Sequence, residues 1–288
     1  MKRGSEMPLK TSFVVLTYNR VDALVAVLNA LALQCDEHHE IVIADDGSNA
    51  QSVAALRQQL PRFRCAVKHV WHPDVGFTAS RARNLGAMAS HADYLVFLDG
   101  DCVPNTRFVK AHEALAEPGC FVNGNRVLLS ERLSQQVCSG QVDLIRASYW
   151  DGLLWRIRGD INKLAHWVYW PQAPGRYESQ FRWKQIRSCN FALWKSDFEA
   201  VNGFDESFQG WGHEDADLVL RLHHQGLRRK NGFFSTEVYH LWHRQNSRHA
   251  EDVNHQRVID RSQTTIVSAT QGIRDNLHAD DVVITSLN

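Results

Sequence analysis

The sequence lacks the motifs of several common protein classes. Its six cysteines form no C-x-x-C pair, so neither a zinc knuckle nor a dithiol redox motif is present. Reduced thiols in a cytoplasm are the simplest explanation. No stretch approaches the ~20 apolar residues of a membrane-spanning helix, and the apolar run 13–16 is too short for a secretory signal. We therefore expect a soluble, cytoplasmic protein.

An excess of either charge is also missing. The 32 Lys and Arg residues balance 32 Asp and Glu residues, which gives no support to a general role in binding nucleic acid or another polyanion. No G-x-G-x-x-G follows the first predicted strand, and no G-x-x-x-x-G-K-[ST] occurs. Dinucleotide-binding and P-loop proteins are therefore poor models for this chain.

The first part of the chain alternates buried strands with helices. Strands are predicted at 12–17, 40–44, 65–71 and 94–98, with helices after residue 20, at 50–60 and at 78–90. This alternation is typical of a doubly wound, mainly parallel α/β sheet. Beyond about residue 120 the pattern is irregular, with further strands predicted at 120–129, at 187–194 and ending at 239–243, and a helix at 213–225.

Polar residues follow the first, second and fourth predicted strands, in the segments 17–20, 45–48 and 99–101. They are expected to converge at one edge of the sheet, where open α/β sheets bind ligands. Gly100 can bend the chain so that Asp99 and Asp101 both point into this crevice. Two such carboxylates repel each other unless a cation lies between them, and Mg²⁺ or Mn²⁺ bridging to a phosphate is the usual one. A plain polar turn is the alternative.

Aromatic residues crowd the segment 141–185. Three interpretations stay open: an insert that packs into the core, a sugar-stacking acceptor groove, and a membrane-surface patch assisted by basic residues. The aromatic residues are Tyr149, Trp150, Trp155, Trp167, Tyr169, Trp170, Tyr177 and Trp183, and the basic residues are Arg146, Arg156, Arg158 and Lys163.

Five motifs in order resemble the GT-A glycosyltransferases, in particular inverting family 2 enzymes whose C-terminal half is similar to the galactosyltransferase C-terminal domain. They are V-V-L-T-Y-N-R, A-D-D-G-S, G-F-T-A-S-R-A-R-N-L-G, F-L-D-G-D and G-W-G-H-E-D-A-D-L, and the resemblance covers about residues 11–245. It implies a Rossmann-like GT-A sheet joined to an acceptor-binding half. We expect a nucleotide-sugar-binding half at 1–125, an acceptor-binding and catalytic half at 126–250, and a C-terminal helix and tail at 251–288.

The resemblance implies a metal site at the DXD motif formed by residues 99–101. Asp101 is expected to ligate Mn²⁺ or Mg²⁺ directly, with Asp99 nearer the donor ribose and reaching the metal through water. His243 stands at the family's metal-histidine position, with His240 in reserve. Because imidazole suits manganese better than magnesium, a histidine ligand favours Mn²⁺. For each histidine alone, a structural or surface role is the alternative.

The same resemblance implies the donor-binding residues. Asp45 and Asp46 would accept hydrogen bonds from the base and the ribose, although a helix cap and turn is the alternative. Tyr18 would stack on uracil. Arg83, rather than its neighbour Arg81, would face the diphosphate. The complete expected set is Thr17, Tyr18, Asn19, Arg20, Asp45, Asp46, Arg83, Asp99 and Gly100.

The motif W-G-x-E-D-x-D implies the catalytic roles. An inverting transfer needs a general base, because the acceptor hydroxyl has a pKa far above neutrality. The resemblance makes Asp215 this base, Glu214 an acceptor ligand, and Trp211 a ring that closes over the donor and stacks on the sugar. Acidic residues that merely stabilise a helix start are the alternative. His213 stands where the galactosyltransferase relatives often have glycine.

These residues lead to one hypothesis of function. It is a metal-dependent inverting glycosyltransferase that moves a hexose (Gal, GalNAc or similar) from a UDP-sugar to a hydroxyl of a glycan or lipid-linked acceptor, in surface polysaccharide biosynthesis. Its partners would be these substrates and the inner face of a membrane, without nucleic acid. Three alternatives stay open: a retaining transferase, a nucleotidyltransferase on the same sheet, and a non-catalytic glycan-binding protein.

Overall fold

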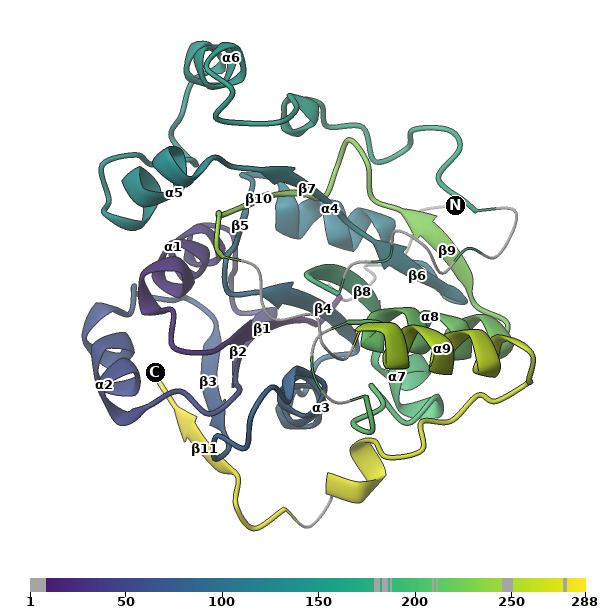
Figure 1. Ribbon diagram of the computed structural model, residues 1–288. Helices are drawn as coiled ribbons and strands as arrows, with labels where there is room; N and C mark the ends of the chain where they lie inside the picture. Colours follow the sequence, from purple (N-terminus) through teal and green to yellow (C-terminus); the bar gives the residue numbers. More distant parts are fainter. Residues whose placement is uncertain are drawn as a thin grey trace, which may run out of the picture.

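The computed structural model describes residues 9–178, 182, 186, 188–208, 210, 212–244, 251–276 and 279–288 (Figure 1). Its strands are β1 (Thr11–Thr17), β2 (His39–Asp45), β3 (Ala66–Trp71), β4 (Tyr94–Asp99), β5 (Cys102–Pro104), β6 (Cys120–Asn123), β7 (Asn125–Leu128), β8 (Asn190–Trp194), β9 (Arg228–Asn231), β10 (Glu237–His240) and β11 (Val283–Ser286). Its α-helices are α1 (Val21–Ala32), α2 (Ala50–Gln59), α3 (Ala79–Ala89), α4 (Phe108–Leu115), α5 (Glu131–Cys138), α6 (Tyr149–Ile157), α7 (Lys195–Ala200), α8 (Glu214–His224) and α9 (Glu251–Ser262). Two 3₁₀ turns are η1 (Ala165–Trp167) and η2 (Ile273–Asn276).

An eight-stranded sheet in the order β11-β3-β2-β1-β4-β8-β6-β9 forms the centre of the molecule. Strands β3, β2, β1 and β4 are parallel to one another, as the sequence predicted. β8 is antiparallel to both of its neighbours, β4 and β6. In the register of β1, Thr17 pairs with Asp45 and Leu16 pairs with Asp99, so the carboxyl ends of three strands meet at one edge.

A second sheet of three strands, in the order β5-β10-β7, stands beside the first. β10 pairs antiparallel with β5 and parallel with β7. The predicted strand at 120–129 is therefore two strands in different sheets, β6 and β7, separated at Gly124, whose N–H donates to the carbonyl of Asn190 at 2.8 Å. This second sheet carries residues from both halves of the chain to the edge where β4 ends.

The segment predicted as a C-terminal helix and tail also contains a strand. β11 pairs antiparallel with β3, with Ile284 opposite Val70. Without this partner β3 would be an edge strand with unpaired backbone groups. The β-branched residues at 282–285 are the sequence signal for this strand.

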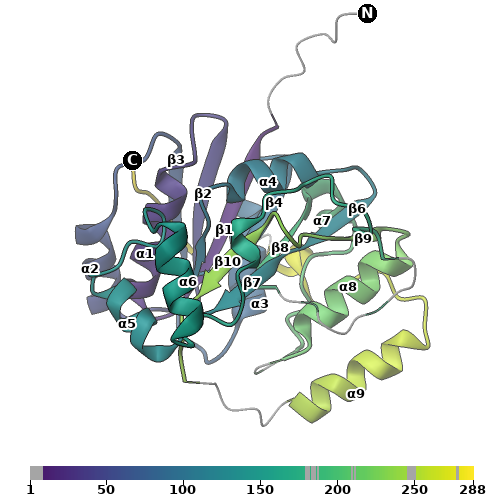
Figure 2. The ribbon, with the colours of Figure 1, turned by 90° about the horizontal axis from the view of Figure 1, so that it is seen from above.

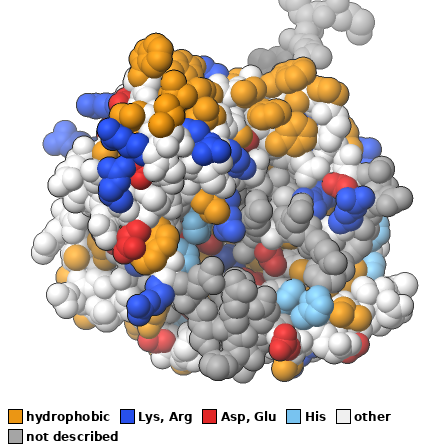
Figure 3. All heavy atoms as spheres, turned by 45° about the horizontal axis from the view of Figure 1, so that its top comes forward, with side chains coloured by type: hydrophobic (Ala, Val, Ile, Leu, Met, Phe, Trp, Pro, Cys, Tyr) orange, Lys and Arg blue, Asp and Glu red, His pale blue; other side chains and the backbone are white. Residues whose placement is uncertain are grey.

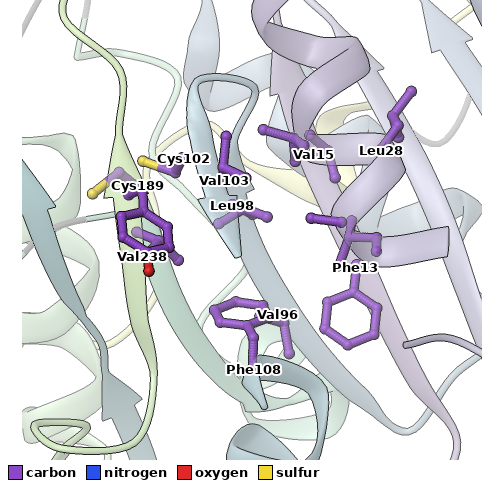
Figure 4. Close-up of a cluster of buried hydrophobic side chains, with 14 of the residues drawn as sticks. Phe13, Val15, Leu28, Val96, Leu98, Cys102, Val103, Phe108, Cys189 and Val238 are labelled. Carbon is purple, nitrogen blue, oxygen red and sulfur yellow. The ribbon is translucent and has the colours of Figure 1, made fainter. Parts of the chain in front are cut away.

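Apolar side chains fill both faces of the central sheet. Alternation along β1 and β4 sends Phe13 and Val96 to one face and Val14 and Phe97 to the other. Helices α1, α4 and α5 cover the first face, where Phe13 lies near Phe108 (Figure 4). Helices α3, α7 and α8 cover the second face. α8 and α9 lie side by side, away from α1 and α2 (Figure 2). Strands buried on both faces hold the polar residues at their ends in fixed positions.

No helix of the described residues has both the length and the apolar character to cross a bilayer.

Candidate active site

The turn between β4 and β5 places the two carboxylates of the D-G-D motif. The N–H of Gly100 donates to the carbonyl of Leu16 at 2.7 Å. A Cβ at position 100 would lie 2.7 Å from the same oxygen, so a side chain there cannot be accommodated without a shift of β1. The backbone of Asp101 is fixed as well, because its carbonyl accepts from the N–H of Leu241 at 2.9 Å. The turn that carries the acids is thus held by backbone contacts with β1 and with the residue after β10.

Asp101 lies beside two histidines and one arginine. Its Oδ2 is 3.5 Å from Nε2 of His243 and 3.3 Å from Nη1 of Arg20, and its Oδ1 is 3.8 Å from Nε2 of His240. The two imidazole rings are 5.3 Å apart between centroids. The antiparallel pairing of β10 with β5 puts His240 opposite Cys102, next to Asp101. The structure therefore brings the predicted ligand His243 and the reserve His240 to the same carboxylate.

This group of side chains fits a divalent cation. Burial lowers the pKa of His240, which keeps its imidazole in the neutral form that ligates metals. Cys102 also lies within reach, with its Sγ 3.7 Å from Oδ1 of Asp101. Burial and the neighbouring Cys189 raise the pKa of the Cys102 thiol well above its usual range, and a soft sulfur ligand suits Mn²⁺ or Mg²⁺ less well than oxygen ligands do. A carboxylate with imidazoles suits Mn²⁺ better than Mg²⁺.

Asp99 has different partners from Asp101. Its Oδ1 is 2.9 Å from Nη2 of Arg83, and Nη1 of the same arginine is 3.4 Å from Oε1 of Glu214. Arg83 is buried, and its guanidinium lies over the ring of Phe204 at 5.4 Å. Within the described residues, Arg83 thus connects an acid at the end of β4 with an acid at the start of α8. Its expected contact with a diphosphate, and the expected contact of Asp99 with metal, stay predictions.

Asp45 and Asp46 are buried and accept hydrogen bonds from the protein itself. Asp45 accepts from the N–H of Ser48 at 2.8 Å and lies 2.8 Å from Nε2 of His69. Asp46 accepts from the N–H and the hydroxyl of Thr78, at 3.1 Å and 2.5 Å. The turn that the sequence offered as an alternative is therefore present. A contact of either carboxylate with a nucleotide stays a prediction.

The loop after β1 is tied to the loop after β2. The N–H of Asn19 donates to Oγ of Ser48 at 2.8 Å, and its side-chain oxygen accepts from the N–H of Asn49 at 2.9 Å. Tyr18 is half exposed, and its hydroxyl donates to Asp74 at 2.9 Å. Thr17 is buried at the last position of β1. Tyr18 is thus the residue of this loop with a ring face open to a ligand.

Asp215, at the start of α8, has the electrostatics of a general base. Burial and the charge of Glu214 raise its pKa to about 7, although the N–H of Ser188, at 3.3 Å, stabilises the ionised form. A carboxyl with a pKa near neutrality can accept a proton and still be ionised at working pH. Strongly shifted values of this kind are common at catalytic positions.

The residue before α8 has a backbone conformation that favours glycine. His213 has φ of 70°, in the left-handed region that costs a residue with a Cβ about 1 kcal/mol or more. Glycine adopts this conformation freely. The helix start therefore carries a strained residue. Trp211, the predicted ring over the donor, lies outside the described residues.

Two histidines of the site were not predicted from the sequence. His69 contacts Asp45, and Nε2 of His72 lies 3.3 Å from Oδ1 of Asp46. Both are buried near the carboxyl end of β3, the neighbour of β2. Polar residues near the carboxyl ends of parallel strands are expected at the ligand-binding edge of the sheet. Because this holds for β3 as well, His69 and His72 could have been predicted.

The aromatic segment forms a separate feature. A cavity of about 290 Å³ lies under α6, and its lining includes Trp155, Trp167, Tyr169 and Tyr239. The ring of Tyr239 on β10 is 4.9 Å from that of His166. Trp155 is buried, as a core-packing insert requires, but Trp150 and Trp170 are exposed. Packing into the core therefore accounts for only part of the segment.

Two family models match the chain in sequence order. Residues 12–130 match the model described as Glycosyl transferase family 2, and residues 175–244 match the model described as the N-terminal domain of galactosyltransferase. The first match contains the D-D-G-S and D-G-D motifs. The second contains Glu214, Asp215, His240 and His243, in the half of the chain where a galactosyltransferase-type segment was expected.

Several curated proteins are similar to the chain. Validoxylamine A glucosyltransferase of Streptomyces hygroscopicus subsp. jinggangensis is 32% identical over 235 residues, which cover 77% of this chain and 53% of that protein. Chondroitin synthase of Escherichia coli is 27% identical over 236 residues, or 75% of this chain and 32% of that protein. The chain thus spans about half the length of the first relative and less of the second.

Two solved structures are similar in fold. Staphylococcus aureus TarS 1-349 in complex with UDP-GlcNAc has a TM-score of 0.58 at 14% identity, covering 92% of this chain and 69% of that one. The mannosyltransferase PcManGT from Pyrobaculum calidifontis, in complex with GDP-Man and Mn²⁺, has a TM-score of 0.55 at 13% identity, covering 96% and 71%. The mainly parallel sheet agrees with the fold of these two structures, and both family matches are to glycosyltransferase models. The chain contains a glycosyltransferase family 2 domain at residues 12–130, followed by a galactosyltransferase-type segment at 175–244, and has the GT-A fold.

Proposed function

We propose that the protein is a metal-dependent inverting glycosyltransferase that moves a hexose, such as Gal or GalNAc, from a UDP-sugar to a hydroxyl of a glycan or lipid-linked acceptor. The observation that carries the proposal is the presence, at one edge of the sheet, of a carboxylate–imidazole cluster and of Asp215 with a pKa of about 7. A role in surface polysaccharide synthesis is supported by the relatives, which include a chondroitin synthase.

Asp101, His240 and His243 are the residues that would hold Mn²⁺. When bound there, the ion supplies positive charge to the diphosphate that leaves with the uridine. Arg20, which contacts Asp101, adds a further positive charge at the same edge. The half-exposed ring of Tyr18 and the buried loop of Asp45 and Asp46 form the proposed base and ribose pocket.

On the acceptor side, Asp215 would remove the proton of the attacking hydroxyl as the new bond to C1 forms. Glu214 would accept a hydrogen bond from the acceptor, and Arg83 holds its carboxylate in place. Arg83 also contacts Asp99, so one side chain sets the distance between the donor and acceptor sides. Trp211 would close over the donor and exclude water, which would otherwise compete as a nucleophile.

The test is a transfer assay with UDP-sugars, Mn²⁺ and candidate acceptors, in which UDP release and the product anomer are measured. Asp101→Ala and Asp215→Ala are expected to abolish transfer and leave the fold intact by circular dichroism. Asp280→Ala, which removes an exposed carboxylate from the C-terminal segment, is the matched control and should transfer normally. Near-normal turnover in either site variant would overturn the proposal, and a product with retained configuration would overturn the inverting mechanism.

A further inference from the structure

The outward face of α6 carries large apolar side chains that are exposed to water. Trp150, Leu154 and Ile157 are spaced i, i+4 and i+7 and therefore form one stripe along the helix. Their exposed fractions are 78%, 41% and 73%. Gly152 and Trp155 are buried and attach the opposite face of the helix to the protein. A contiguous apolar stripe of this kind usually marks an interaction surface.

Basic side chains border this stripe. Arg156 and Arg158 are exposed, and no ion pair joins either of them to another residue in the described part of the chain. The helix carries one acidic residue, Asp151, which accepts from the N–H and hydroxyl of Ser148 in a capping box, so the two arginines outnumber it. Figure 3 shows hydrophobic side chains gathered on this upper part of the molecule with Lys and Arg side chains beside them. The surface therefore combines apolar area with a net positive charge.

We propose that α6 docks on the surface of an anionic lipid bilayer. Trp150, Leu154 and Ile157 would enter the headgroup region, and Arg156 and Arg158 would contact lipid phosphates. Helices with one apolar face and basic flanks lie in the plane of the membrane in this way, and tryptophan favours the interface. The nine residues of α6 are far too few to span a bilayer, so the contact is peripheral.

A second copy of the chain fits the stripe less well than a bilayer. A two-fold interface centred on α6 would place one net positive patch against an identical patch, because the same surface is used on both sides. Like charges in such a contact repel each other. A bilayer with anionic lipids instead offers negative charge at the depth of the arginines and apolar chains at the depth of the stripe. The docking does not depend on the transferase chemistry proposed above.

The test is co-sedimentation of the full chain with vesicles of phosphatidylcholine alone or with added phosphatidylglycerol. Wild type is expected to pellet with the anionic vesicles and to show a blue shift of tryptophan emission. Trp150→Ser combined with Ile157→Ser should lower the partition coefficient at least about tenfold, because two apolar anchors are lost. Arg156→Gln and Arg158→Gln should each lower it about fivefold, and added salt should reduce binding.

Matched controls come from the opposite end of the molecule. Val283→Ser with Ile284→Ser removes two exposed apolar side chains of β11, which lies at the bottom of Figure 1 while α6 lies at the top. This variant should bind vesicles like wild type. The proposal is overturned if wild type stays in the supernatant with anionic vesicles, or if both double variants bind equally. It is also overturned if light scattering shows a dimer that only the α6 variant dissociates.

Discussion

Arg83 on α3 and Asp99 at the end of β4 form an ion pair of 2.9 Å, and the same arginine reaches Glu214 at 3.4 Å. Because Arg83 is buried, its loss leaves two acids facing each other with little water to screen them. The guanidinium therefore holds together two parts of the site that lie far apart in the sequence.

We expect Arg83→Met to lower the free energy of unfolding by about 3–5 kcal/mol, the usual result of breaking a buried ion pair from one side. Arg81→Met is the matched control, because Arg81 on the same helix pairs with the exposed Asp281. Its cost should stay below about 1 kcal/mol. Urea denaturation measures both values, and equal losses for the two variants would contradict a special role for Arg83.

His240 and His243 are expected to contribute separately to metal binding. Each lies within 4 Å of Asp101, so His240→Ala and His243→Ala should each weaken Mn²⁺ binding at least about tenfold. Titration calorimetry with Mn²⁺ and UDP measures the affinity. His38→Ala, an exposed histidine outside the cluster, should bind like wild type. A variant that keeps full affinity would remove its histidine from the ligand set.

The pKa of Asp215 predicts the pH dependence of transfer. The base must be ionised, so kcat/KM should rise about tenfold per pH unit below about 7 and level off above it. Asp215→Asn should abolish transfer, whereas Asp280→Asn should keep the wild-type profile. A flat profile across neutrality in the wild type would contradict the assignment of Asp215 as the base.

The same shift predicts how stability depends on pH. Because the folded state raises the pKa of Asp215 from near 4 to about 7, folded molecules bind more protons than unfolded ones between these values. The contribution of Asp215 to stability is therefore lost as the pH rises through this window. Asp215→Asn is expected to melt above the wild type at mildly alkaline pH and to show a smaller difference at acid pH. Thermal denaturation at both pH values measures this, and a lower melting temperature for the variant at alkaline pH would contradict it.

Gly86 permits the close packing of α3 on the sheet. A Cβ at this position would lie 2.7 Å from Cγ1 of Val14 and 3.1 Å from Cβ of Ala44. Gly86→Ala should therefore lower the free energy of unfolding by about 1–3 kcal/mol, despite the better helix propensity of alanine. Combining it with Val14→Ala, which removes the closest atom, should recover part of this loss. Urea denaturation of the single and double variants tests the packing, and simple additivity would contradict it.

Much of the fold could be predicted because its signals are local. β1, β2 and β4 are continuous apolar runs, and the parallel arrangement of these strands brings 17–20, 45–48 and 99–101 to one edge. The strand at 120–129 could not be divided correctly, because β6 and β7 pair with partners more than sixty residues away. Pairing of this kind leaves no trace in local periodicity.

The composition of the site could be predicted better than its contacts. The resemblance selected Asp101, His243 and Asp215, and the structure places the first two together. Nothing in the motifs indicated that Asp99 pairs with Arg83, because this pairing depends on the position of α3 relative to the end of β4. The motifs also did not indicate that the carboxylates of Asp45 and Asp46 accept hydrogen bonds from other residues of the protein.

The hydrogen bond from Leu241 to Asp101 has a consequence for biosynthesis. A ribosome delivers Asp101 well over one hundred residues before His240 and His243, and β10 cannot align beside β5 until residues 237–241 have emerged. A nascent polypeptide truncated ahead of β10 would therefore present the acids without either histidine, so the proposed cation site would form only after β10 has been synthesised.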